Sequence, residues 1–230
     1  MNDPVIAYRP FLNTDPPAIV DLWKQQPRFR RLSSTVSRND FDRLVFGKPY
    51  FDPDGFIVAV DDERPCGFVH AGFGPNDDGS DLGYETGLLL QLRCHERDDA
   101  SEVRSELTTR ALEYLRQNGS TVCFAASRFP WVPYYLGLYG GSRIPGVPHE
   151  DESMMQALQQ EGFETSDRIL VFQLKLTGFR PRVDRNQMTV RRQFQIAAVV
   201  DPQPSNWWDN CMYGMAETFA FRLVDRRSKM

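Results

Sequence analysis

The chain is most constrained by one unit near its middle, in which an apolar strand, a short loop, a long helix and a second strand follow one another. The strands span residues 85–94 and 121–125, and the helix spans residues 101–118 and is closed by Gly119. The helix carries an apolar stripe at helical spacing, made of Val103, Leu107, Ala111, Leu112 and Leu115. A strand that runs into a helix N-terminus brings together free N–H groups and the positive end of the helix dipole, so this unit favours a phosphorylated ligand.

The loop inside that unit has the wrong chemistry for a phosphate. Residues 95–100 contain no glycine and three acids, Glu96, Asp98 and Asp99. A phosphate loop needs glycine where the backbone approaches the ligand closely, and carboxylates repel an anion. Asp99 followed three residues later by Glu102 resembles a helix-capping pair instead. The architecture therefore indicates a phosphorylated cofactor, whereas the loop argues against one.

Composition argues against several classes of function. The net charge is −4, so the chain has no basic surface for nucleic acid, and no apolar run approaches the roughly 20 residues of a membrane helix. Residues 1–4 do not begin a secretory signal. The four cysteines are scattered and the three histidines show no metal-ligand spacing. We therefore expect no metal site, no nucleic-acid or membrane partner, and a reducing, cytoplasmic setting.

The remaining elements predict a mixed α/β domain with an antiparallel first half and a crossover helix in the second. The domain should end near residue 180, so we expect one domain over residues 1–180 and an extension over residues 181–230. Turn formers, capping residues and apolar periodicity place the elements outside the central unit as follows: a strand at 5–9, helices starting at Thr14 and at Ser37 or Asn39, a hairpin of strands at 55–60 and 66–73, a helix from Asp151 to Gly162, and a closing strand at 168–176.

The extension is too short for an ordinary core of its own. Residues 188–200 and 217–224 read as strands, and residues 207–213 as a short helix. A lone pair of strands is marginally stable in water, so the pair must bury its apolar face against the first domain or against a second copy of the chain. We favour the second copy, and so a homodimer, because exposed strand edges recruit partners.

In element order, in the central unit and in the turn at residues 160–164, residues 5–176 resemble the GNAT family of N-acetyltransferases. Residues 67–76 and 135–142 resemble, more narrowly, the first repeat of a bacterial subgroup that has two GNAT repeats in one chain. The resemblance implies a mostly antiparallel central sheet flanked by helices, with the central strands splayed near residues 92–94. Residues 181–230 would then correspond to the opening strands of a second repeat.

The same resemblance implies acetyl-CoA as co-substrate, with its pyrophosphate on an Arg/Gln-x-x-Gly-x-Gly/Ala loop. Ungapped matching places residues 99–104 on that loop, where Glu102 and Arg104 fill both glycine positions and Asp99 and Ala100 replace the expected basic residues. We therefore expect weak or absent acetyl-CoA binding, unless Arg97 and Arg104 support it; a helix that is simply well capped is the structural alternative. The candidate cofactor-binding residues are Leu92, Arg93, Cys94, Arg97, Ala100, Ser101, Glu102, Val103 and Arg104.

Acetyl transfer needs a path for the amine proton and a group that protonates the leaving thiolate. The candidate catalytic residues are Glu85, at the entrance of the central strand, and Tyr135 and Tyr139, after the central strand pair. The position at which family members often have a tyrosine acid is Leu158 here, and we read His70 and His95 as structural. Two hypotheses follow: an acetyltransferase of a small amine with a degraded cofactor loop, or a GNAT-fold binding or dimerisation module without catalysis.

Overall fold

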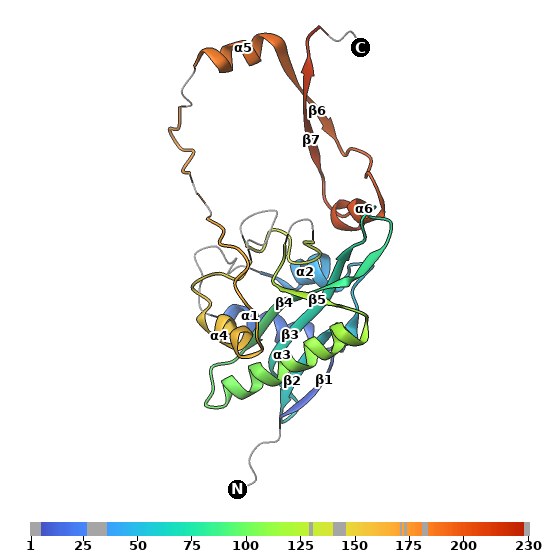
Figure 1. The fold of residues 1–230 in the computed structure, drawn as a ribbon, viewed down its shortest axis with the longest axis vertical. Coiled ribbons are helices and arrows are strands. Elements are labelled where there is room, and N and C mark those ends of the chain that lie inside the picture. Colours follow the sequence, from blue (N-terminus) through green and yellow to red (C-terminus); the bar gives the residue numbers. More distant parts are fainter. Residues whose placement is uncertain are drawn as a thin grey trace. The chain divides into compact units, whose positions relative to one another are not determined.

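The computed structural model describes residues 6–26, 36–128, 131–139, 146–170, 172, 174–180 and 184–227. The chain divides into two compact units, Met1–Ile169 and Leu170–Met230, and each is described by itself (Figure 1). No helix among these residues is long and apolar enough to cross a bilayer.

The first unit is built on one five-stranded sheet in the order β1-β2-β3-β4-β5 (Figure 1). Its strands are β1 (Ala7–Pro10), β2 (Phe56–Asp61), β3 (Arg64–Pro75), β4 (Leu82–Cys94) and β5 (Val122–Ala125). The first four strands pair antiparallel with their neighbours, and β5 pairs parallel with β4 after the crossover helix. The predicted fold class, a mixed and mostly antiparallel sheet with flanking helices, is therefore confirmed.

The helices start where the sequence places capping residues and prolines. Ser37 and Asp40 form a capping box at the start of α2, and two prolines open α1. The helical segments of this unit are α1 (Pro16–Gln25), α2 (Arg38–Phe41) continuing into a π-helix at Asp42–Phe46, a 3₁₀ turn at Pro53–Gly55, α3 (Ala100–Gln117) and α4 (Glu152–Gln160).

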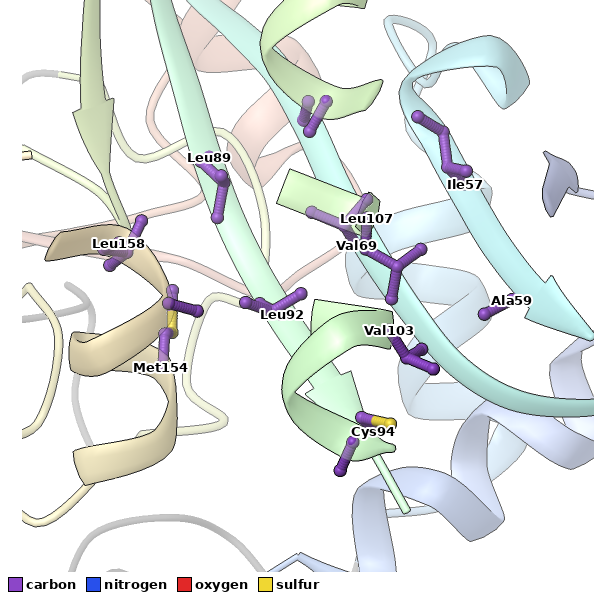
Figure 2. Close-up of a cluster of buried hydrophobic side chains, with 14 of the residues drawn as sticks. Ile57, Ala59, Val69, Leu89, Leu92, Cys94, Val103, Leu107, Met154 and Leu158 are labelled. Atoms are coloured by element: carbon purple, nitrogen blue, oxygen red, sulfur yellow. The ribbon is translucent and has the colours of Figure 1, made fainter. Parts of the chain in front are cut away.

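Both faces of the sheet are covered. One face packs against α3 and α4 through aliphatic side chains, with Val103 and Leu107 of α3 over Val69 and Leu92 of the sheet (Figure 2). The other face is aromatic: Phe56 of β2 stacks on Phe68 of β3, and Trp23 of α1 stacks on Tyr135, with ring centroids 5.0 and 5.7 Å apart. Leu89, Leu92 and Cys94 of β4 face the aliphatic layer, and a register shift opposite His70 and Ala71 interrupts the strict alternation of its side chains.

The two central strands separate part of the way along β4. Their pairing ends at Leu89 opposite Ala125, and β4 continues through residues 90–94 to Cys94. Ala126, with φ +60°, turns the chain away while its N–H donates to the Leu89 carbonyl at 2.6 Å. β5 therefore pairs with β4 no further than Leu89, and the splay expected near residues 92–94 stays a prediction.

The second unit contains α5 (Arg185–Gln193), β6 (Phe194–Val200), α6 (Trp207–Tyr213) and β7 (Phe219–Asp225), with β6 and β7 antiparallel. The strand predicted at 188–200 is wrong in its first half, because the Asp184 side chain accepts from the Gln187 N–H at 2.8 Å and starts a helix there. The predicted helix at 207–213 is confirmed, and β7 largely matches the strand predicted at 217–224.

The closing strand predicted at 168–176 is also wrong. The residues of this segment that the structure describes lie outside helices and strands, and Leu170 and Phe172 are 80% and 88% exposed. An alternating apolar pattern specifies a strand only where a neighbouring strand pairs with it, and none is paired with these residues. The division between the two units falls inside this segment.

Candidate cofactor and catalytic site

The loop between β4 and α3 holds its arginine between two carboxylates. Arg97 Nη1 lies 2.9 Å from Asp61 Oδ2, and Arg97 also forms a two-pronged ion pair with Asp99. The hydrogen bonds to Asp99, followed by those to Asp61, raise the pKa of Arg97, and the same contact lowers the pKa of Asp99. Both side chains are therefore charged at neutral pH, and Arg97 already forms ion pairs with two acids of its own chain.

Asp99 occupies the N-cap position of α3, but its side chain makes no capping hydrogen bond. The prediction that Asp99 caps the helix is therefore wrong, because its carboxylate turns to Arg97 instead. Arg104, one turn into the helix, lies 3.3 Å from the exposed carboxylate of Glu96. Of the other expected contact residues, Ala100 and Val103 are buried in the core, whereas Ser101 and Glu102 are exposed.

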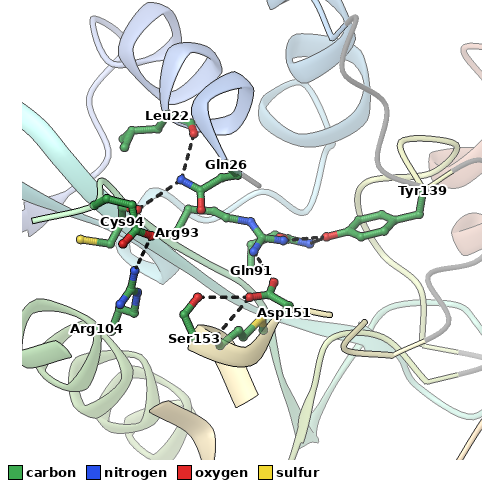
Figure 3. Close-up of polar contacts among 11 residues, drawn as sticks. Leu22, Gln26, Gln91, Arg93, Cys94, Arg104, Tyr139, Asp151 and Ser153 are labelled. Atoms are coloured by element: carbon green, nitrogen blue, oxygen red, sulfur yellow. Dashed lines mark hydrogen bonds and ion pairs between the residues drawn. The ribbon is translucent and has the colours of Figure 1, made fainter. Parts of the chain in front are cut away.

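The end of β4 lies beside a pocket of about 260 Å³. Leu92 and Cys94 turn their side chains into the core beneath α3 and α4, and the Cys94 carbonyl accepts from Gln26 Nε2 at 3.2 Å (Figure 3). The pocket is lined by Gln25, Gln26, Cys94, His95 and Glu96. A second hollow, of about 40 Å³, lies between α3 and α4 and includes Ser101 and Arg104. Both are smaller than the roughly 300–1,000 Å³ of an ordinary small-molecule site.

On the opposite face of β4, a buried polar network surrounds Arg93. Arg93 Nη1 donates to Asp151 Oδ2 at 2.5 Å, and its Nη2 donates to the Tyr139 hydroxyl at 3.2 Å (Figure 3). Gln91 Nε2 donates to the same hydroxyl at 2.5 Å. Burial alone lowers the pKa of Arg93, but Tyr139 and Asp151 together outweigh it and raise the pKa. The guanidinium therefore stays charged in the interior.

Asp151 connects this network to α4. Its carboxylate accepts from the Met154 N–H at 3.2 Å, which caps the helix, while it pairs with Arg93. The two charged side chains are each 2% exposed. One buried ion pair therefore fixes α4 to the end of β4.

His70 and Tyr135 form a second buried pair, with His70 Nδ1 2.8 Å from the Tyr135 hydroxyl. Burial lowers the pKa of His70 to about 3 and raises the pKa of Tyr135 well above its ordinary value, so both side chains are neutral. The backbone of Tyr135 has φ +61°, a left-handed conformation that residues other than glycine rarely adopt. His70 Nε2 and Gln91 Oε1 have no hydrogen-bond partner among the described residues.

The structure brings two of the three candidate catalytic residues together. Tyr135 and Tyr139 lie with His70, Gln91 and Arg93 on the aromatic face. Glu85 is exposed near the start of β4, where its carbonyl accepts from the Thr121 N–H at 2.9 Å. At about 3.3 Å per residue it lies roughly 20 Å along the strand from Gln91.

Sequence reasoning did not predict the network of Gln91, Arg93 and Asp151: Arg93 was expected among the cofactor-binding residues and Asp151 only at the start of a helix. The available signal was the spacing of two polar residues at positions 91 and 93 in an otherwise apolar strand, which puts both side chains on one face. Among the described residues, no group of three or more His, Cys, Asp or Glu side chains is placed to hold a metal ion.

No protein-family model and no curated protein sequence matches the chain. Among solved structures it is similar to the aminoglycoside N-acetyltransferase AAC(6')-Iy in complex with CoA, with 13% identity, 76% of this chain and 97% of that chain covered, and a TM-score of 0.50. AAC(6')-IG from Acinetobacter haemolyticus (12% identity, 74% and 98% covered, TM-score 0.47) and a ribosomal-protein-alanine N-acetyltransferase from Brucella melitensis (10%, 74% and 99%, 0.47) also match. The likeness to AAC(6')-Iy shows that the first unit has the fold of the GNAT N-acetyltransferases.

Proposed function

We propose that the first unit is an N-acetyltransferase domain that takes acetyl-CoA as acyl donor and a small amine as acceptor, with a weak grip on the cofactor's diphosphate. The observation that carries the proposal is the separation of β4 from β5 after Leu89, in a fold shared with a CoA-bound acetyltransferase. Beyond Leu89, β4 stays paired with β3 on one edge only, and an unpaired strand edge offers its backbone to an extended ligand. Residues 92–94 are the part of β4 that would receive the pantetheine arm.

The proposed proton donor is Tyr139. In acetyl transfer the amine nitrogen attacks the acetyl carbonyl carbon, the C–S bond breaks, and the thiolate takes up a proton. The Tyr139 hydroxyl accepts hydrogen bonds from Gln91 and Arg93, so its own proton is left to donate. Tyr135 is less suited to this step because burial raises its pKa strongly. Glu85 stays a prediction for the base, and its exposed position requires the amine to deliver its proton through water.

Weak binding of the diphosphate is expected from the contacts of the loop between β4 and α3. Arg97 is held by Asp61 and Asp99, and Arg104 lies beside Glu96, so a diphosphate would have to compete with carboxylates for both arginines. The side chain of Glu102 adds a further charge where close backbone approach is needed. We expect a dissociation constant in the high micromolar range or weaker, about −5 kcal/mol.

Calorimetry with two donors tests this. Acetyl-pantetheine lacks the diphosphate, so the wild-type chain should bind acetyl-CoA no more tightly than acetyl-pantetheine. Asp99→Asn removes one of the two carboxylates that hold Arg97 and leaves the pair with Asp61, and we expect it to tighten acetyl-CoA binding several-fold while leaving acetyl-pantetheine unchanged. Glu106→Gln is the matched control, because Glu106 is a half-buried acid of α3 that pairs with Arg110 of the same helix. Submicromolar binding of acetyl-CoA by the wild-type chain would refute the expectation that the diphosphate is bound weakly.

The second candidate is a GNAT-fold binding or dimerisation module without catalysis. It is favoured by Gln26, whose side chain already occupies the Cys94 carbonyl at the end of β4. A variant with Asp99→Arg, Glu102→Gly and Arg104→Gly separates the two candidates. If it gains acetyl-CoA binding and acetylates a panel of small amines, as read by mass spectrometry, the enzyme is supported; if it binds neither donor, the module is.

Two further assignments, to a subgroup of the family and to a cellular compartment, are also proposals. We propose that the first unit corresponds to the first repeat of the bacterial tandem subgroup, with residues 181–230 as the opening strands of a second. A cytoplasmic setting is supported by the four cysteines, all of which are free thiols.

A further inference from the structure

The hairpin of β6 and β7 has one face that is almost entirely apolar. In its antiparallel register Ile196 lies opposite Leu223, Ala198 opposite Phe221, and Val200 opposite Phe219. Residues directly opposite one another, and residues two apart along a strand, point to the same face. These six side chains therefore form one continuous surface, which is called the hairpin face below. None of the six is charged, and the nearest charge on the same side is Asp225, opposite Phe194 at the end of the hairpin.

The other side of the same hairpin is mixed. There Gln195 lies opposite Val224, Ala197 opposite Arg222, and Val199 opposite Ala220. A strand that faces water on one side and a core on the other has this two-sided composition. The sequence of the hairpin thus specifies that the hairpin face is to be covered.

Within the second unit, no described residue covers the hairpin face. Its five large side chains are between 57% and 72% exposed, and Ala198 is exposed with them. For side chains of this size the exposed fractions correspond to roughly 600 Å² of apolar surface, which is the upper end of what a monomer ordinarily shows. A two-stranded hairpin is marginally stable in water, so leaving this surface uncovered is costly.

We propose that the hairpin face is an interface between two copies of this chain, packed face to face about a two-fold axis. A surface without charge at its centre is complementary to itself, as a two-fold interface requires. Two such faces together bury roughly 1,200 Å², the lower limit of a specific and stable protein interface. Side chains from two facing sheets interdigitate at about 10 Å separation, which suits alternating large and small residues such as Phe221 and Ala198.

Sedimentation of the full chain tests the proposal, with two substitutions on opposite sides of one hairpin. Phe221→Asp places a charge at the centre of the hairpin face, and we expect the dimer to dissociate roughly thirtyfold or more easily. Val199→Asp places the same charge on the mixed side and should leave the dimer intact. A wild-type chain that sediments as a monomer at every concentration measured overturns the proposal. The hairpin face is then covered within one chain.

Cross-linking keeps the test decisive if Phe221→Asp fails to fold. Ala198→Cys lies at the centre of the hairpin face and Ala197→Cys on the mixed side. A short bis-maleimide should join two copies of the Ala198→Cys chain and not two copies of the Ala197→Cys chain, above the baseline of the wild-type cysteines. A dimer that survives Phe221→Asp, or one that the reagent does not cross-link through Ala198→Cys, places the interface elsewhere and refutes the assignment.

Discussion

Lowering the pH from 7 to 5 should destabilise the first unit through His70. This ring is fully buried, and burial lowers its pKa to about 3, whereas the unfolded chain titrates near 6.5. Between those values the unfolded chain binds a proton that the folded chain does not, so the free energy of unfolding falls as the pH falls. The slope reaches about 1.4 kcal/mol per pH unit, and the loss between pH 7 and pH 5 amounts to about 2 kcal/mol. Above the unfolded pKa the stability is fully present.

Urea unfolding at pH 7, 6 and 5 measures this loss, with tryptophan fluorescence as the signal. Trp23 is a suitable reporter, because it is 1% exposed and stacks on Tyr135, the hydrogen-bond partner of His70. His70→Asn keeps a polar group beside Tyr135 and does not titrate. We expect the wild-type chain to lose about 2 kcal/mol more than this variant over the two pH units.

The comparison with His70→Asn makes the result specific. Burial also lowers the pKa of the half-buried His95, which acts in the same direction but is present in both chains and cancels. Equal pH dependence in the wild-type chain and in His70→Asn would refute the reasoning, because it would mean that His70 can be protonated in the folded state.

The remaining predictions concern the core. Arg93→Met leaves Asp151 as an unpaired buried charge, and urea unfolding should show a loss of about 3–5 kcal/mol. Arg110→Ala, which removes a half-buried ion pair on α3 and a contact with the Tyr8 ring, should cost only about 1 kcal/mol. Gly74→Ala would place a Cβ 2.2 Å from Trp131 Cδ1, and the same assay should show a loss of about 1–3 kcal/mol; an unchanged midpoint would mean that Trp131 moves freely.

Much of the first unit could be predicted because its local patterns agree with its packing. Val103, Leu107, Ala111 and Leu115, whose spacing predicted the long helix, are each at most 1% exposed in the core. The hairpin of β2 and β3 was likewise marked by two apolar runs around a turn. Where apolar periodicity, capping and turn residues point to the same element, sequence alone is sufficient.

The buried polar network could not be predicted in the same way. Gln91 and Arg93 mark a face of β4, but their partners Tyr139 and Asp151 lie 46 to 58 residues away along the chain. Which polar side chains meet in the interior depends on how the segment after β5 returns over the sheet. The strand predicted at 168–176 was wrong for a related reason. Apolar periodicity predicts which side chains would share one face of a strand, but it does not show whether a neighbouring strand is there to pair with it.

The charges around the N-terminus of α3 decide the balance between the two proposed functions. Among the described residues no ion pair involves Asp98 or Glu102, so these two carboxylates remain after Arg97 and Arg104 are paired. At about 7 Å in water each would repel each charge of a diphosphate by about 0.6 kcal/mol, or about 2 kcal/mol together. The helix dipole offers an anion only about 0.3–1 kcal/mol at an exposed terminus. For the two charges of a diphosphate the dipole term becomes about 0.6–2 kcal/mol, so the two carboxylates offset it. If the proposed function holds, we therefore expect most of the affinity for acetyl-CoA to come from its pantetheine arm along residues 92–94.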